Sequence, residues 1–236
     1  MLANVSFKTW ARNELLGIVV SATSLSLLTL MPALAQPAGN RSLPPQKSNR
    51  VIIDSKMTKK EAFDGLDRNC PTEIRKRQKL IKVQYYSFDG RLHRGQLVID
   101  KDLVKDIKTV FKLILKEHFP VRSVIPISDI RFRKNGRWDD DLSMAADNTS
   151  AFNYRPVTGG TRLSNHAYGR AIDINTFENP YIKGSTTLPP GAKYDSAAAG
   201  TFTQDNPIVQ LFLRLGWAWG GNWTSPKDYQ HFEKPK

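Results

Sequence analysis

The sequence is poor in cysteine and in histidine. It has a single cysteine, Cys70, in 236 residues, which excludes an intramolecular disulfide and a cysteine-rich zinc module. Its four histidines are His93, His118, His166 and His231. A metal site in this chain must therefore be built from a few histidines together with carboxylates.

Long uncharged hydrophobic runs are also absent, except near the N-terminus. There a basic start is followed by a run rich in Leu, Val, Ala and Ser over 15–30, then by Pro32 and by Ala33-Leu34-Ala35. This order of features is typical of a secretory signal peptide. We predict that 1–35 is cleaved and that the rest, with no stable membrane span, is exported to the periplasm or the cell wall. The alternative is an uncleaved anchor, because 15–35 is long enough to cross a bilayer.

Negative charge is scarce relative to positive charge. Lys and Arg number 35 and Asp and Glu 22, so the net charge is +13. A basic exported protein suggests anionic partners such as acidic cell-wall polymers; the alternative is that the charge serves only solubility. Zinc-finger, basic-zipper and RNA-recognition patterns are missing, so we expect no nucleic-acid partner.

The composition predicts one folded domain behind a linker. A hydrophobic content of 40% can form a core, and the Pro-, Gly-, Ser- and Asn-containing stretch 36–58 reads as a flexible linker. We expect a monomer whose domain, 59–236, is α+β, with helices flanking a small, mostly antiparallel sheet.

Hydrophobic periodicity places the elements of this domain. The pattern predicts helices over 59–66, 104–115 and 207–215, with Asp100 or Asp102 capping the second. Strands are expected over 80–87 and 92–99, joined by an Asp89-Gly90 turn, and over 121–133, 150–155, 171–175, 217–219 and 229–232. The stretch 179–203 has no clear periodicity and reads as a long loop.

Two clusters of residues carry candidate chemistry, one over 164–175 and one over 228–233. Ligands of one zinc ion have donor atoms about 3–4 Å apart. A continuous helix would separate His166 and Asp173 by about 10 Å, and a continuous strand by about 23 Å. The chain must therefore turn between them if they share an ion, and Gly169 is the residue that permits it.

Such a turn would place Asp173 on a strand, with Ile172 and Ile174 on the opposite face. A carboxylate buried there requires a cation. The alternatives are that Asp173 pairs with an arginine at a strand end, and that His166 is an ordinary loop residue. Composition leaves both open.

The motif Ser164-x-His166-x-x-Gly169-x-Ala171-x-Asp173 resembles the signature of the zinc D-alanyl-D-alanine carboxypeptidase and L-alanyl-D-glutamate endopeptidase family, which includes VanY-like enzymes. The segment 216–223 (GWAWGGNW) and the following Asp-x-x-His-Phe resemble its endopeptidase branch. The resemblance covers about 150–233 and extends loosely upstream to Ile81. It implies a Hedgehog/D,D-peptidase-like fold and peptidoglycan stem peptides as substrates.

The resemblance also implies roles for single residues. It assigns Zn²⁺ to His166, Asp173 and His231, general-base catalysis to Asp228, and stabilisation of the oxyanion to Arg155. Three protein ligands are typical of catalytic zinc, which keeps one coordination position open. Asp228 is close enough in sequence to His231 to take a proton at the site.

Several of these roles have competitors. Arg162 is a second candidate for stabilisation of the oxyanion. The alternative role for Arg155 is a salt bridge with one of the three aspartates over 139–141. We expect Ser164, Tyr168 and Trp219 to contact substrate. The tryptophans at 217, 219 and 223 alternatively serve as core and pocket wall, and we expect the remaining histidines, 93 and 118, at the surface.

The sequence thus predicts an exported zinc peptidase of cell-wall stem peptides, most simply an L-alanyl-D-glutamate endopeptidase. A D-alanyl-D-alanine carboxypeptidase would share the metal chemistry. The alternative from another class is a non-catalytic wall-binding module in which zinc serves only folding.

Overall fold

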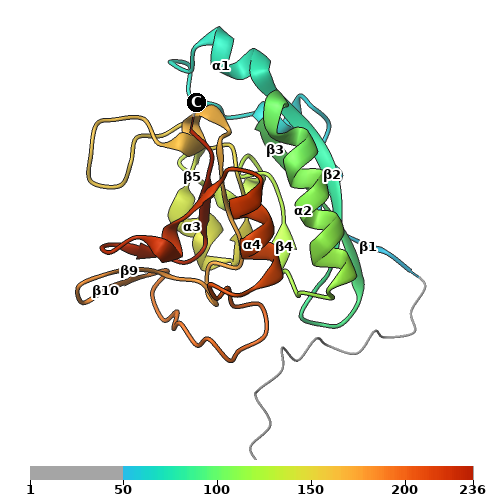
Figure 1. Ribbon diagram of the computed structural model, residues 1–236. Helices are drawn as coiled ribbons and strands as arrows, with labels where there is room; N and C mark the ends of the chain where they lie inside the picture. Colours follow the sequence, from blue (N-terminus) through green and yellow to red (C-terminus); the bar gives the residue numbers. More distant parts are fainter. Residues whose placement is uncertain (1–49, 236) are drawn as a thin grey trace, which may run out of the picture. The chain divides into compact units, whose positions relative to one another are not determined.

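The computed structural model describes residues 50–235 (Figure 1). The predicted signal peptide, 1–35, and most of the predicted linker lie outside these residues. Among the helices of the described part, none combines the length and the apolar character that a membrane crossing requires.

The described chain contains both helices and mostly antiparallel strands, which is consistent with the predicted α+β domain. The helices are α1 (Thr72–Arg77), α2 (Val104–Lys116), α3 (Asp140–Ala145) and α4 (Pro207–Arg214), with 3-10 turns at Glu61–Phe63, Lys101–Leu103, Ile130–Phe132, Asn165–Tyr168 and Gly220–Asn222. The predicted helices over 104–115 and 207–215 are confirmed, whereas the one over 59–66 is a single 3-10 turn. Helices α1 and α3 escaped prediction because six residues are too few to show a periodic apolar stripe.

The strands within residues 50–235 form five small sheets. One contains β1 (Ile52–Ile53), β3 (Leu92–Asp100) and β2 (Gln78–Tyr86); a second contains β10 (Thr186–Leu188), β9 (Tyr181–Lys183) and β12 (Lys227–Asp228); a third contains β11 (Ala218–Trp219), β13 (His231–Glu233) and β8 (Ala171–Asp173). Two pairs complete the set, β4 (Ser123–Val124) with β7 (Asn148–Thr149) and β5 (Arg133–Lys134) with β6 (Arg137–Trp138). The pairing is mostly antiparallel, with β1–β3 and β4–β7 parallel.

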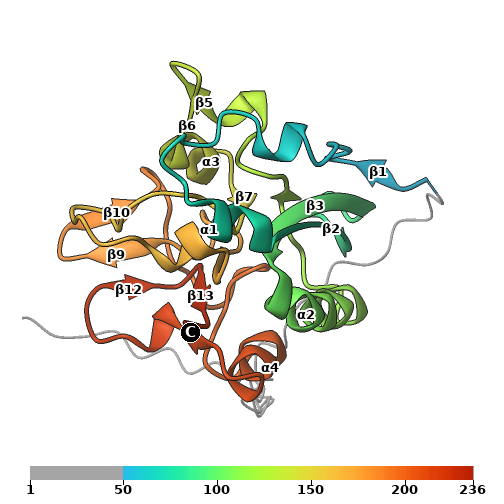
Figure 2. The ribbon, with the colours of Figure 1, turned by 90° about the horizontal axis from the view of Figure 1, so that it is seen from above.

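The core lies between the β2–β3 hairpin, α2, α4 and the β8–β13–β11 sheet. Helix α2 buries Ile107, Val110, Phe111 and Ile114, and it runs along the hairpin beside α4 (Figures 1 and 2). Ile172 and Phe232, from β8 and β13, belong to the same buried cluster. The predicted hairpin is confirmed, and Asp100 accepts a hydrogen bond from the backbone of Asp102 at the start of the turn leading into α2.

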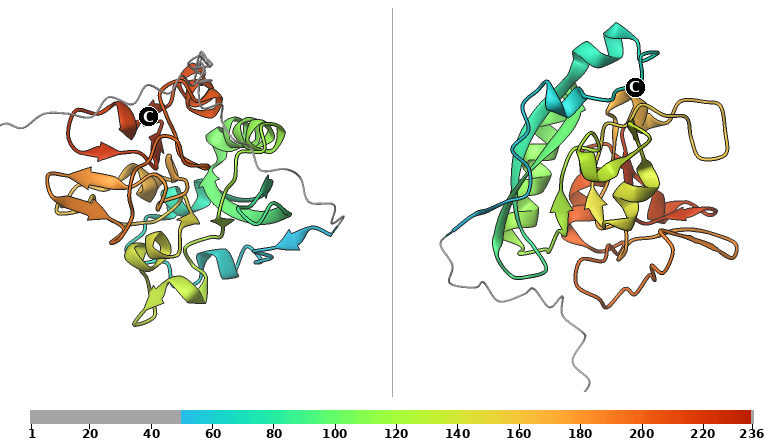
Figure 3. Two further views of the ribbon diagram at one scale, coloured as in Figure 1. Left: turned by 90° about the horizontal axis from the view of Figure 1, so that it is seen from below. Right: turned by 180° about the vertical axis from the view of Figure 1, so that it is seen from behind.

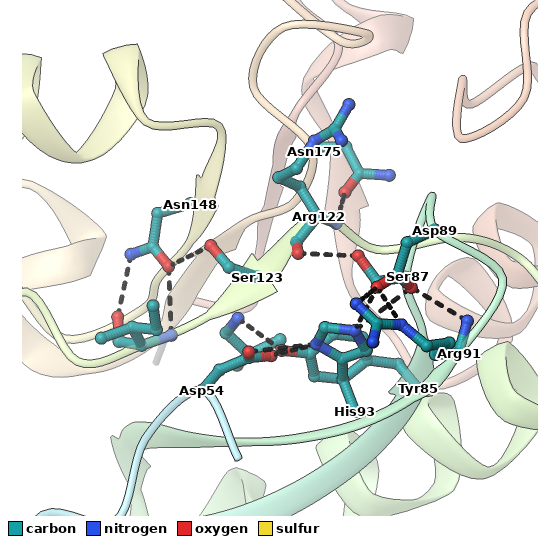
Figure 4. Close-up of polar contacts among 12 residues, drawn as sticks. Asp54, Tyr85, Ser87, Asp89, Arg91, His93, Arg122, Ser123, Asn148 and Asn175 are labelled. Atoms are coloured by element: carbon teal, nitrogen blue, oxygen red, sulfur yellow. Dashed lines mark hydrogen bonds and ion pairs between the residues drawn. The ribbon is translucent and has the colours of Figure 1, made fainter. Parts of the chain in front are cut away.

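Two predicted strands are mostly absent. Over 121–133 only Ser123–Val124 and the first residue of β5, Arg133, are in strands, and over 150–155 only Ser150 makes a bridge, to Asp173. The amide of Asn148 accepts from Ser123 Oγ and Ile125 N, each at 3.1 Å, and donates to Ile125 O at 2.9 Å (Figure 4). One side chain therefore satisfies backbone groups that a longer ladder would otherwise pair.

The stretch 179–203 is more ordered than its sequence indicates. It begins with the β9–β10 hairpin, and β9 also pairs with β12, so that Tyr181 lies opposite Asp228. This hairpin protrudes on the side of the domain away from β2 and β3 (Figures 2 and 3). Three-residue strands are too short for alternation to be recognised.

The last residues of the predicted linker belong to the folded domain. Ile52–Ile53 pair with β3, and the Gln96 side chain accepts from Ser55 Oγ at 2.7 Å and donates to Met57 O at 2.9 Å. His93, expected at the surface, is buried between Asp54 and Asp89, with Nδ1 2.9 Å from Asp54 Oδ2 (Figure 4). These contacts fasten the segment 52–57 to β3.

The turn predicted at Gly169 is present. Gly169 has φ = +64°, in the left-handed region, and follows the 3-10 turn that carries His166. Its carbonyl accepts from Asp100 N at 2.9 Å, and a Cβ atom on it would lie 2.0 Å from Gln78 Oε1. Backbone conformation and packing both require glycine here.

We expect Gly169→Ala to lower the free energy of unfolding by roughly 1–3 kcal/mol, because it adds backbone strain and displaces the Gln78 side chain. Gly159→Ala is the matched control, since Gly159 has φ = +73° but nothing within 4 Å of its Cβ position. Urea unfolding followed by tryptophan fluorescence measures both. Equal losses in the two variants would contradict the packing argument.

Candidate metal centre and active site

Strand pairing brings the two sequence clusters together. In the antiparallel pair β8–β13, His231 lies directly opposite Asp173, and side chains of opposed residues project to the same face. The other face of β8 carries Ile172, and Ile174 follows the strand directly; both are fully buried in the core. The predicted division of β8 into a ligand face and a core face is therefore present.

His166 reaches the same point from the 3-10 turn before Gly169. Its ring Nε2 lies 3.1 Å from Asp173 Oδ2 and 3.2 Å from His231 Nδ1, and His231 Nδ1 lies 2.9 Å from Asp173 Oδ1. All three residues are buried, and one donor atom from each falls within 4.8 Å of the others. Asp173 thus contacts two histidines, and within residues 50–235 no arginine forms an ion pair with it.

The remaining ring nitrogens have partners that suit a metal centre. His166 Nδ1 lies 2.7 Å from the carbonyl of Ala151, and His231 Nε2 lies 3.1 Å from Glu233 Oε2. A neutral imidazole that donates through one nitrogen presents a lone pair at the other. Both lone pairs then face Asp173, as expected for metal-ligating histidines whose outer nitrogen is hydrogen-bonded. The donor set of two nitrogens and one carboxylate fits Zn²⁺.

The electrostatics of the cluster favour a charged carboxylate. Burial raises the pKa of Asp173, but the positive charge of protonated His166 and His231, with the hydrogen bonds that these rings then donate, outweighs burial and holds that pKa below its usual range. A buried anion of this kind needs a positive counterpart. A divalent cation would supply it without requiring either imidazole to be protonated.

Glu233 is a site residue that the sequence reasoning left without a role. Its carboxylate accepts from Asn165 Nδ2 at 2.6 Å as well as contacting the His231 ring. The hydrogen bond with His231 lowers the pKa of Glu233, and this effect is larger than the rise caused by burial. The pKa of Glu233 therefore lies below its usual value. Glu233 lies two positions after His231, and residues i and i+2 of a strand share a face. This spacing was the feature of the sequence that could have placed Glu233 beside His231.

Asp228 lies beside the cluster on β12. Its Oδ1 is shielded from solvent and has no hydrogen-bond partner among the described residues. Burial, with a further contribution from the charge of Asp173, raises the pKa of Asp228 to about 6. Gly220 allows the close approach, because a Cβ there would lie 2.4 Å from Asp228 O.

A cavity of about 440 Å³ opens over these groups, with Asp228, Arg155, Arg162 and Ser164 in its walls. Buried atoms without hydrogen-bond partners gather here: besides Asp228 Oδ1, they include Arg155 Nε and Gln230 Oε1. Unsatisfied buried polar atoms are rare in folded proteins. Their concentration indicates a place where a ligand would complete the hydrogen bonding.

Arg155 combines the two roles considered for it. Its guanidinium lies 2.6 Å from Asp140 Oδ2, so the salt bridge to one of the three aspartates is formed, yet both residues also line the cavity. Arg162 lines the same cavity from the exposed loop after β7. The structure therefore places both arginines at the site.

The three residues predicted to contact substrate are placed differently from one another. Ser164 lines the cavity and its Oγ accepts from His166 N at 3.3 Å. Trp219 packs in the core against Phe232 and donates to Tyr229 O, and neither Trp219 nor Tyr168 lines the cavity. Trp223, which was not given a substrate role, does line it.

Comparison with known families supports a peptidase. Residues 158–234 match a family model described as D-alanyl-D-alanine carboxypeptidase. The matched segment contains His166, Asp173, Asp228 and His231, whereas Arg155 precedes it. Neither a curated protein nor a solved structure matches the chain significantly. The match is consistent with the family that the two motifs resemble.

We expect Glu233→Ala to weaken zinc binding about 10–100-fold, because the His231 ring loses the carboxylate that orients it. Glu233→Gln keeps a hydrogen-bond acceptor and should lose less. Competition with a chromophoric chelator measures the zinc affinity, and Glu73→Ala, at an exposed position on α1, is the matched control. Wild-type affinity in Glu233→Ala would remove this role.

Proposed function

We propose that this protein is a zinc metallopeptidase that hydrolyses peptide bonds in the stem peptides of peptidoglycan outside the cytoplasm. The observation that carries the proposal is the unpartnered, shielded Oδ1 of Asp228 beside the His166, Asp173 and His231 cluster in a cavity. The family match adds support for peptide hydrolysis.

The residues divide the chemistry among them. His166, Asp173 and His231 would hold the zinc ion, which supplies activation of water and polarisation of the scissile carbonyl when bound. Asp228 accepts a proton from the attacking water and returns it to the leaving amine. A pKa of about 6 suits this exchange near neutral pH. Arg155 supplies positive charge where the oxyanion develops.

The salt bridge between Arg155 and Asp140 affects how the Arg155 side chain is held in the cavity. Asp140 also accepts from Asn153 Nδ2 at 2.9 Å, so its carboxylate is held by two donors. This anchoring orients the Arg155 side chain, while its buried Nε keeps a free hydrogen for a ligand. Arg155 is therefore a better fit for oxyanion stabilisation than the exposed Arg162.

A non-catalytic wall-binding module is the less favoured function. Structural zinc sites are closed by four protein ligands, whereas three donors converge in this cluster. A structural site also has no use for an adjacent carboxylate that lacks a hydrogen-bond partner. The cavity and Asp228 both favour catalysis.

Two versions of the proposal differ in the peptide bond that is cut. The resemblance of 216–223 to the endopeptidase branch favours the L-alanyl–D-glutamate bond, and this is the version we adopt. The description of the matched family favours the terminal D-alanyl–D-alanine bond. We further propose that the signal peptide directs export and that the protein acts as a monomer, with acidic wall polymers as additional partners of its basic surface.

We expect Asp228→Asn to lower kcat at least 10²-fold while the zinc content stays at one ion per chain, because the amide cannot accept the proton. Asp141→Asn, at an exposed position on α3, is the matched control. Mass spectrometry of purified stem peptides after digestion, with and without a chelator, measures the loss and identifies the bond.

A fully zinc-loaded wild-type protein that releases no fragment from any stem peptide would refute the proposed function. Full activity in Asp228→Asn would instead remove only the assignment of the base. Release of D-alanine alone would replace the endopeptidase by the carboxypeptidase.

A further inference from the structure

A second cavity adjoins the active-site cavity. It has a volume of about 720 Å³ and shares two wall residues with the first, Asp140 and Arg155. All of its lining residues lie between 65 and 156, upstream of the matched segment 158–234. The part of the chain outside the family match therefore builds a surface that continues the catalytic site.

The walls of this second cavity are held by specific contacts. Trp138 Nε1 donates to Asp64 O at 2.7 Å, which fastens the β5–β6 hairpin to the segment before α1. Tyr154 donates from its hydroxyl to Asn69 O at 3.3 Å on the opposite side. Trp138 and Tyr154 also pack against the same small hydrophobic cluster around Phe152. The cavity is thus a built feature of the fold.

The wall charges that form no ion pair sum to a net positive charge. The carboxylate of Asp140 is bound by Arg155 and Asn153, whereas that of Asp67 forms no ion pair within residues 50–235 and accepts from Asn69 N at 2.8 Å. The other two charged residues of the wall, Arg68 and Arg137, make no ion pair or side-chain hydrogen bond within residues 50–235. Two guanidinium groups are therefore free to bind an anion.

We infer that the second cavity binds a carboxylate-bearing part of the substrate peptide, outside the catalytic cavity, through Arg68 and Arg137. The inference rests on the proposed peptidase function and extends it to substrate selection. Guanidinium groups pair with carboxylates in two parallel hydrogen bonds. A peptide that crosses the Arg155–Asp140 border occupies both cavities at once.

The test uses peptides that share the cleaved bond and differ by single Glu-to-Gln replacements along either side of it. We expect one replacement to raise KM about tenfold in the wild type, as for the loss of two partly exposed ion pairs. The double variant Arg68→Ala with Arg137→Ala should show the same rise with the Glu peptide. When the Gln peptide is combined with the double variant, the two rises in KM should not add, because both changes remove the same interaction.

Lys134→Ala is the matched control, since it removes a positive charge from the same hairpin at a residue outside the cavity wall. It should leave the Glu-over-Gln preference intact, and the preference should shrink at high salt. The inference would be overturned if the rises in KM from the Gln peptide and the double variant added. It would also be overturned if Lys134→Ala raised KM as much as the double variant does.

Binding to the zinc-loaded Asp228→Asn variant separates this inference from the proposed function. Tighter binding of the Glu peptide, abolished by the double variant, would retain the cavity's role even if the wild type cut none of the peptides. Cleavage without any preference would retain the peptidase and remove the second cavity from substrate binding.

Discussion

The antiparallel pairing of β8 with β13 is the constraint on which the site depends. It places Asp173 and His231 opposite each other although 58 positions separate them in the sequence. Ile172 and Phe232 anchor the same pair of strands in the core, so the register of the ligands is set by hydrophobic burial. A slip of β13 by one residue would turn His231 towards the core and Phe232 towards the cavity, so that Asp173 would lose its partner.

Charge distribution is the second feature that links fold to chemistry. Asp173 is kept ionised by two histidines, while burial raises the pKa of Asp228 towards neutrality. Two carboxylates beside the same histidine, His231, thus have opposite environments. Such a separation of pKa values is characteristic of sites that combine a permanent anion with a proton acceptor. Glu233 adds a third acid with a different task, that of orienting the His231 ring.

Much of this site was accessible from the sequence, and the reasons are local. The resemblance of two short motifs to a known family indicated the metal ligands, and the spacing of His166 and Asp173 indicated the turn at Gly169. Glu233 escaped because its role depends on the ring orientation of His231. The salt bridge of Arg155 with one of the aspartates over 139–141 was one of the two roles expected for Arg155, and Asp140 forms it. The strand expected over 121–133 is mostly absent, and the Asn148 side chain pairs both backbone groups of Ile125 there. Over 150–155 the backbone bonds to separate segments, for example Phe152 N to Val98 O and Asn153 N to His166 O, so no continuous ladder forms. Pairing of β9 with β12 requires tertiary context that no local pattern contains.

The central claim is that three side chains from the two motifs hold one divalent ion. Anomalous diffraction on either side of the zinc absorption edge tests it most directly, in crystals of the protein grown with zinc. The account predicts a single strong peak between His166 Nε2, His231 Nδ1 and the carboxylate of Asp173, at about 2.0–2.2 Å from each. A fully occupied zinc peak elsewhere, with these three side chains bonded only to one another, would contradict it.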